Sequence, residues 1–210
     1  MQKARTLFEQ QFKDKNGKDW INAAAIYQYA TLQKDSVLEN IWYARAWDAG
    51  FYNRIWLYQA YRQKGLELTL KSPLATNRDK ATMVAMLAAR EPGRSLKSLQ
   101  RAYQFDPTLP DLSKLLAREV NKLENWLLSP KLHGQPLRFE IPYQENDNGP
   151  DNAALLKADL EHLSACRTFV AKVIAEQKRT DPGFWLLSAA HLAFLDQDFK
   201  GTQGLVNQGL

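Results

Sequence analysis

The spacing of hydrophobic positions along the chain follows the period of an α-helix. Between residues 77 and 90, Ala81, Val84, Ala85 and Ala88 recur every three or four residues, which places them on one helix face. Gly and Pro are few, ten and nine residues in 210, and long runs lack both. This pattern predicts an all-α protein rather than a many-stranded sandwich.

The expected helices are separated by local stop and start signals. Asn16-Gly17 and Ser72-Pro73 are typical of turns, and Asp19 and Asp35 are candidate N-caps. The face of the second helix is expected to carry Trp20, Ala23, Ala24, Tyr27 and Ala30. The predicted helices cover residues 3–13, 19–30, 36–50, 51–70, 77–90, 95–105, 111–128 and 153–178, followed by a pair joined at Gln197-Asp198.

One stretch interrupts this helical pattern. Residues 131–150 contain three Pro and two Gly, and Leu137–Ile141 alternates apolar and charged side chains as a short extended segment does. Irregular stretches of about twenty residues are uncommon inside compact domains. The sequence therefore predicts one domain with a helical region at 1–130, an irregular loop at 131–150, and C-terminal helices at 151–210 that continue the array.

Three segments of the chain resemble tetratricopeptide repeats, which are helix pairs of about 34 residues with small side chains where the helices cross. In the segment that matches best, the expected positions are occupied by Ser95, Leu96, Leu99, Ala102 and Pro107, and Leu116 and Ala117 occupy the expected places in the next repeat. The second segment matches at Asp19, Trp20, Ala23, Tyr27 and Ala30. The third is the stretch from Trp185 through Ala190 to Asp198-Phe199. The resemblance covers about half the chain. It implies antiparallel helix pairs stacked as a tetratricopeptide-like α-solenoid.

Charge and cysteine content narrow the functional classes. The net charge is +5, with the basic residues spread along the chain, so the balance permits nucleic acid without favouring it. Cys166 is the only cysteine, which rules out an internal disulfide and a site built from several thiolates. No apolar run approaches the length of a membrane span, and residues 1–11 are too polar for a signal peptide. Because the helical pattern is still running at Gly209-Leu210, we expect the chain to be a piece of a longer protein.

Candidate catalytic and metal-binding residues lack a supporting context. His162 and Cys166 lie four residues apart on one predicted helix, as metal ligands do, but no third ligand has a matching spacing. Asp159 and Glu161 belong to a helix surface, and the acidic residues near 147 lack the spacing of a calcium loop. The sequence therefore predicts no catalytic residue, metal site or cofactor.

An aromatic cluster offers the strongest candidate for a binding surface. Its aromatic side chains occur on more than one helix face, so a single thin core cannot accommodate all of them. Packing between successive helix pairs is the simplest alternative. The cluster consists of Trp42, Tyr43, Trp47, Phe51, Tyr52, Trp56, Tyr58 and Tyr61, interleaved with Arg45, Arg54 and Arg62. Among these, Trp42, Trp47 and Trp56 are predicted to enter partner pockets, while Arg45 and Arg54 pair with acidic groups.

A second candidate surface is basic. Arg94, Lys97 and Arg101 recur on one face of the predicted helix 95–105, where they form either a solvated outer face or a contact for an acidic partner.

These features lead to a functional expectation with two alternatives. We expect a non-enzymatic scaffold that holds a protein or peptide. The first alternative is a glycan-, small-molecule- or nucleic-acid-binding module of a larger enzyme, and the second is a structural spacer in an envelope protein. Oligomeric state stays open. The compartment also stays open, between the cell envelope or periplasm and the cytoplasm.

Overall fold

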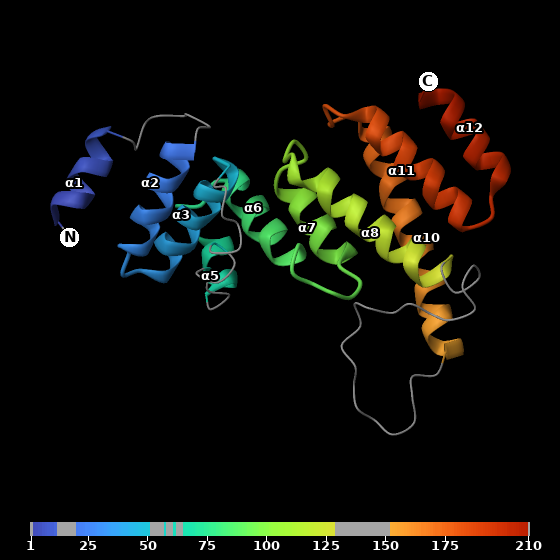
Figure 1. Ribbon diagram of the computed structural model, residues 1–210, viewed down its shortest axis with the longest axis horizontal. Coiled ribbons are helices and arrows are strands. Elements are labelled where there is room, and N and C mark those ends of the chain that lie inside the picture. The colour runs from blue at the N-terminus through green and yellow to red at the C-terminus, as the bar shows by residue number, and fades with distance from the viewer. Residues whose placement is uncertain are drawn as a thin grey trace.

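A computed structural model describes residues 2–11, 20–50, 57, 61, 65–128 and 152–209, and these residues are helical wherever they form regular structure (Figure 1). No strand occurs in this part of the chain, which confirms the all-α prediction. The helices follow one another along the long axis of the molecule, so its two termini lie at opposite ends.

The N-terminal helices are α1 (Gln2–Gln11), α2 (Trp20–Thr31) and α3 (Ser36–Asp48). Asp35 caps α3, as predicted, since its carboxylate accepts hydrogen bonds from the backbone N–H groups of Val37 and Leu38. The predicted face of α2 is wrong at Trp20, whose side chain is exposed. The face that packs against the core instead includes Ala23, Ile26 and Ala30, and Trp20 lies in the first turn, at the tip of the helix.

A short helix, α5 (Leu66–Lys71), replaces the end of the long helix predicted at 51–70. Gly65 precedes it with a φ of 89°, a conformation that breaks a right-handed helix and that glycine adopts without steric strain. The predicted continuous helix is therefore wrong at its C-terminal end.

The helices predicted at 77–90 and 95–105 are confirmed as α6 (Asn77–Ala88) and α7 (Leu96–Phe105). Thr76 and Asp79 form a capping box at the start of α6, in which each side chain accepts a hydrogen bond from the other residue's backbone N–H. Ala81 and Ala88 are fully buried on α6, as is Ala102 on α7. Small side chains let the two helix backbones approach closely.

The C-terminal half contains α8 (Asp111–Leu127), α10 (Asn152–Glu176), α11 (Pro182–Leu195) and α12 (Phe199–Gly209). The helices α8 and α10 match the predicted helices 111–128 and 153–178 within two residues at either end, and α11 and α12 are the predicted pair joined at Gln197-Asp198. The predicted loop at 131–150 lies outside the described residues.

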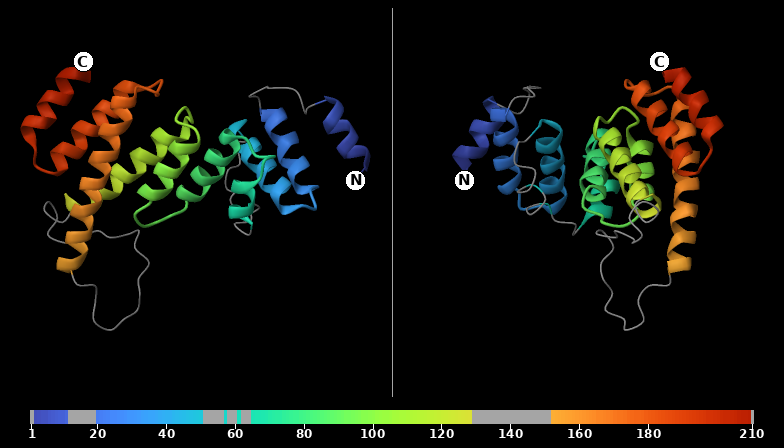
Figure 2. Two further views of the ribbon diagram at one scale, coloured as in Figure 1. Left: turned by 180° about the vertical axis from the view of Figure 1, so that it is seen from behind. Right: turned by 45° about the vertical axis from the view of Figure 1, so that its right-hand side comes forward.

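The packing joins each helix to its neighbours in the row (Figure 2). Besides contacts between consecutive helices, α3 contacts α6, α6 contacts α8, and α8 contacts α11. One hydrophobic cluster extends from Phe8 on α1 to Leu195 at the end of α11. Among the described residues, no helix has the length and apolar character needed to cross a bilayer.

Candidate functional site

An open groove lies between α5 and the C-terminal end of α6. Its volume is about 800 Å³. Leu68 in its wall is an exposed apolar side chain, with 67% of its surface accessible. We call this feature the α5 groove; it is lined by Gly65, Leu66, Glu67, Leu68, Leu87, Arg90, Glu91 and Pro92.

The first wall of the groove is positioned by the contact of α5 with α3. Thr69 is fully buried and accepts a hydrogen bond at 3.2 Å from the Asn40 amide, while its hydroxyl donates to the Gly65 carbonyl at 3.0 Å. Leu70 is buried beside it. Because Thr69 and Leu70 face the core, Glu67 and Leu68 lie on the solvent side of this short helix.

An ion pair then fixes α5 to α7. The Arg101 guanidinium donates two hydrogen bonds to the Glu67 carboxylate, at 2.8 and 2.9 Å. These hydrogen bonds and the positive charge of Arg101 lower the pKa of Glu67. Glu67 therefore remains ionised at neutral pH, and Arg101 compensates its charge at the edge of the groove.

The second wall is the turn between α6 and α7, where two basic side chains of α8 donate hydrogen bonds to backbone carbonyls. Arg118 donates to the Ala89 and Glu91 carbonyls at 2.6 and 3.1 Å, and Lys122 donates to the Glu91 and Gly93 carbonyls at 3.1 and 2.6 Å. These bonds satisfy the carbonyls of the C-cap residue Ala89 and of the turn that follows it. The turn is thereby held in one conformation.

The lining of the α5 groove combines apolar and charged side chains. Leu66, Leu68, Leu87 and Pro92 provide apolar surface, and Arg90 and Glu91 accompany Glu67 as charged lining residues. Apolar walls with a few charged groups are typical of sites that take an apolar side chain and orient the polar backbone around it. Among the described residues that line the groove, none is Ser, Cys, His or Lys.

The residues of α3 that were predicted to bind a partner make contacts within the molecule. Trp47 is 4% exposed, and its indole N–H donates to the Asp111 carboxylate at 2.7 Å. Trp47 therefore packs in the core and does not present its ring to a partner. Trp42 is half-buried, and the Arg45 guanidinium stacks over its ring at 4.6 Å. The guanidinium of Arg45 also donates two hydrogen bonds to the carboxylate of Asp79, at 3.0 and 3.1 Å.

The other two predicted anchors, Arg54 and Trp56, lie outside the described residues. The predicted basic stripe on α7 is largely neutralised within the molecule, because Arg101 pairs with Glu67 and Arg94 pairs with the fully buried Asp159. Lys97 remains exposed.

His162 and Cys166 do come together, in a buried polar cluster between α8 and α10. The imidazole Nε2 lies 2.9 Å from a Glu119 carboxylate oxygen and 3.7 Å from the Cys166 Sγ. Lys122 donates to the other Glu119 oxygen at 2.6 Å, and Ser95 donates to Glu119 from both its backbone N–H and its hydroxyl. Glu119 and Cys166 are fully buried.

The hydrogen bonds and charges of this buried cluster join α8 to α10. Burial raises the pKa of Glu119, but hydrogen bonds from His162, Lys122 and Ser95 outweigh this effect and lower the pKa to about 2. Burial and the Glu119 charge raise the pKa of the Cys166 thiol to about 12. A thiol of this kind is a poor nucleophile and metal ligand. No group of three potential metal ligands occurs among the described His, Cys, Asp and Glu residues.

The sequence pointed to the aromatic cluster and missed the α5 groove. Leu68 could have been identified only by recognising Gly65 as a helix break, since that glycine separates α5 from the preceding residues. Trp47 could not have been recognised as buried, because its partner Asp111 is 64 residues away.

Comparison with known proteins gives no relative: no protein family, curated protein or solved structure matches this chain.

Proposed function

We propose that this chain is a non-enzymatic interaction module that binds a peptide segment of a partner protein in the α5 groove. The observation that carries the proposal is the groove itself, with its volume of about 800 Å³ and its exposed Leu68. Specific binding sites of folded proteins are concave and largely apolar, with a few polar groups that set orientation.

The same proposal includes a tetratricopeptide-like array of stacked antiparallel helix pairs. Three features support it: contacts between next-but-one helices, fully buried alanines where α6 crosses α7, and ion pairs between equivalent positions. Arg45 pairs with Asp79, and Glu67 pairs with Arg101, each across 34 residues. This separation equals the length of one tetratricopeptide repeat, about 34 residues.

The groove favours a peptide that places an apolar side chain against Leu68 and Leu87. Glu67, Arg90 and Glu91 all line the groove, so the charged groups of a bound peptide meet both signs. An apolar anchor with mixed charges around it distinguishes this mode from binding to nucleic acid, which requires a continuous basic surface.

Selection from a displayed library of random peptides tests the proposal. The wild-type protein is expected to enrich peptides that share an apolar residue at a fixed position. The variant Leu68→Asp places a charge on the apolar wall and should weaken binding of the enriched peptides at least about tenfold. Fluorescence anisotropy of labelled peptides gives the dissociation constants.

Leu187→Asp provides a matched control, because Leu187 is an exposed leucine on α11, outside the groove lining. This variant should bind the enriched peptides like the wild type. Failure to enrich any shared pattern, or equal binding by Leu68→Asp, would refute a peptide-binding role for the α5 groove.

A further inference from the structure

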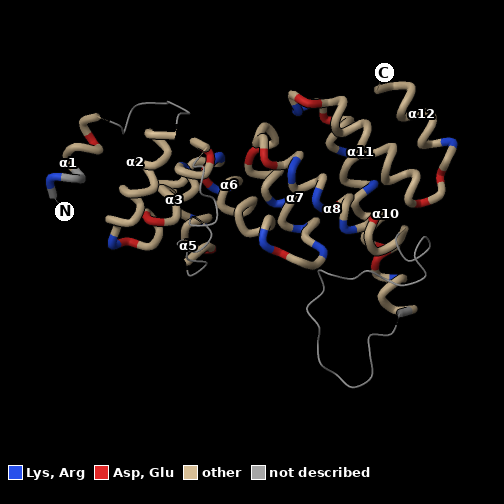
Figure 3. The backbone as a smooth tube through the Cα atoms, viewed as in Figure 1, with Lys and Arg blue, Asp and Glu red and all other residues tan. Residues whose placement is uncertain are grey.

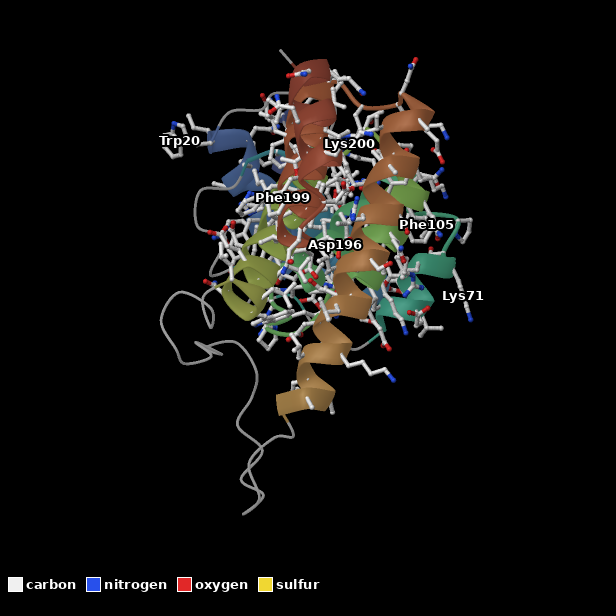
Figure 4. The ribbon with its side chains drawn as sticks, turned by 90° about the vertical axis from the view of Figure 1, so that its right-hand side faces the viewer. Trp20, Lys71, Phe105, Asp196, Phe199 and Lys200 are labelled. Atoms are coloured by element: carbon white, nitrogen blue, oxygen red, sulfur yellow. The ribbon has the colours of Figure 1, made fainter. Side chains whose placement is uncertain are left out.

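The α5 groove is bordered by exposed basic side chains from both of its walls and from α7. Arg90 is exposed in the lining. Lys71 is exposed one helical turn after Glu67 and points away from α5 into solvent (Figure 4). The hydrogen bonds and charge of Arg101 lower the pKa of Glu67, and the charge of Lys71 lowers it further, so the Lys71 ammonium acts at the edge of the groove. Lys97 is exposed one turn before Arg101 on α7.

The two carboxylates of the lining already have partners within the molecule. The Glu67 carboxylate accepts two hydrogen bonds from α7. The Ser98 hydroxyl donates to the Glu91 carboxylate, whose oxygens lie 3.1 and 3.2 Å from it. Within the described part of the chain, by contrast, Lys71 and Lys97 make no ion pair. A basic group of a ligand would have to compete with the partners of the carboxylates, whereas an acidic group would not.

The turn that forms the second wall is also rich in positive charge. Arg90 and Arg94 lie on either side of Glu91 along this turn (Figure 3), and Arg94 pairs with Asp159 of α10. Arg118 of α8 donates hydrogen bonds to two backbone carbonyls of the turn, which brings its guanidinium against the same wall. The two carboxylates of the lining are therefore outnumbered by the basic side chains around them.

We propose that the peptide bound in the α5 groove is acidic: it places an apolar residue against Leu68 and Leu87, an adjacent Asp or Glu pairs with Arg90, and Lys71 attracts further acidic residues. This inference rests on the peptide-binding function proposed above and adds the charge of the ligand. A carboxylate forms strong hydrogen bonds with a guanidinium. Complementary charges at an interface select among partners and speed their encounter. The net charge of +5 of the whole chain acts in the same direction.

The apolar walls distinguish an acidic peptide from a nucleic acid, which basic groups would also attract. The groove is lined by Leu66, Leu68, Leu87 and Pro92, and two carboxylates lie among them. A phosphate backbone requires a continuous basic surface and would be repelled by these carboxylates. A peptide can place its apolar residue on the walls and its carboxylate at Arg90.

Binding of three matched peptides tests the inference. They share the apolar residue that library selection identifies, and their neighbouring positions are Asp and Glu, Asn and Gln, or Lys and Arg. Fluorescence anisotropy should show that the acidic peptide binds at least about tenfold more tightly than the basic one, with the neutral peptide between them. The affinity of the acidic peptide should fall as the salt concentration rises. Equal affinities of the three peptides would overturn the inference and leave the peptide-binding function standing, whereas the absence of any enriched apolar residue would refute both.

Charge reversal at the groove locates the effect. Arg90→Glu and Lys71→Glu should each weaken binding of the acidic peptide about fivefold and strengthen binding of the basic one. Lys157→Glu is the matched control, since Lys157 is exposed on α10, outside the groove lining, and its reversal changes the net charge by the same amount. Circular dichroism confirms that each variant folds. An equal effect of Lys157→Glu would overturn the assignment to the groove. A single-stranded oligonucleotide that binds as tightly as the acidic peptide, and equally to Leu68→Asp, would overturn the proposal in favour of nucleic acid.

Discussion

Glu119 is a buried carboxylate on which three other side chains depend. It accepts hydrogen bonds from Lys122, His162 and Ser95, and Lys122 is itself 2% exposed. Replacing Glu119 by Gln would leave the buried ammonium of Lys122 without its counter-charge, which is expected to destabilise the fold by about 3–5 kcal/mol. Urea denaturation measures this loss.

Glu124→Gln is the matched control, since Glu124 lies on the same helix and forms a solvent-exposed pair with His191. Its effect should stay below about 1 kcal/mol. Equal stability of the two variants would show that the buried polar cluster does not hold α10 against α8.

The lowered pKa of Glu119 also predicts a pH dependence. Folding lowers the pKa of this carboxyl from 4.5 to about 2, so the folded state favours its ionised form. The stability from this group is complete above about pH 4.5 and is lost as the pH falls through about 2. As the pH falls over this range, the free energy of unfolding should decrease less for Glu119→Gln than for the wild type. Equal decreases for the two proteins would show that Glu119 does not cause this pH dependence.

The thiol of Cys166 is predicted to be inert in the folded protein. It is fully buried, and its pKa is raised to about 12. Reaction with a thiol-specific reagent at pH 8 should therefore be negligible in buffer and complete, at one thiol per chain, in denaturant. Rapid reaction in the folded state would reveal an accessible thiolate that this packing does not allow.

At the scale of elements, Arg179 connects the turn before α11 to the segment that starts α8. Its guanidinium donates to the Pro107 and Leu109 carbonyls, both at 2.8 Å, and to the Ser113 hydroxyl at 2.9 Å. The side chain is only 4% exposed. This single residue therefore joins segments about seventy positions apart in the sequence.

Arg179→Lys should destabilise the protein by about 1–3 kcal/mol, because one ammonium cannot reproduce the planar fork and leaves buried carbonyls without donors. Thermal unfolding followed by circular dichroism measures the change. Arg101→Lys, at an exposed ion pair, serves as the control and should shift stability by less than about 1 kcal/mol. A smaller effect at Arg179 than at Arg101 would contradict its connecting role.

Helix boundaries could be predicted where they depend on residues close by in the sequence. Asp35 caps α3, and Pro107 follows the end of α7, because capping and chain reversal depend on residues within a few positions. The α5 helix was missed because its separate start depends on the left-handed backbone of Gly65 and on the contact of Thr69 with Asn40 of α3. Such long-range contacts override the helical period of the sequence.

The candidate site was less predictable than the helices for the same reason. Aromatic side chains mark either a core or a surface, and the choice for Trp47 depends on Asp111, a residue far along the chain. Exposure of Leu68 likewise follows from which side of α5 packs on α3. Composition identified the side chains capable of binding, but tertiary packing decided which of them face solvent.

For the molecule as a whole, the proposed peptide site occupies one part of a row of helices. The α5 groove lies between α5 and the C-terminal end of α6, and α11 and α12 lie at one end of the row, outside the groove lining.

Hydrogen–deuterium exchange of the wild-type protein, with and without an enriched peptide, locates the bound peptide. Binding in the α5 groove should slow exchange at α5 and at residues 88–93, the two walls of the groove, and leave exchange in α11 and α12 unchanged. Protection confined to α11 and α12, or to any segment other than these two walls, would contradict binding in this groove.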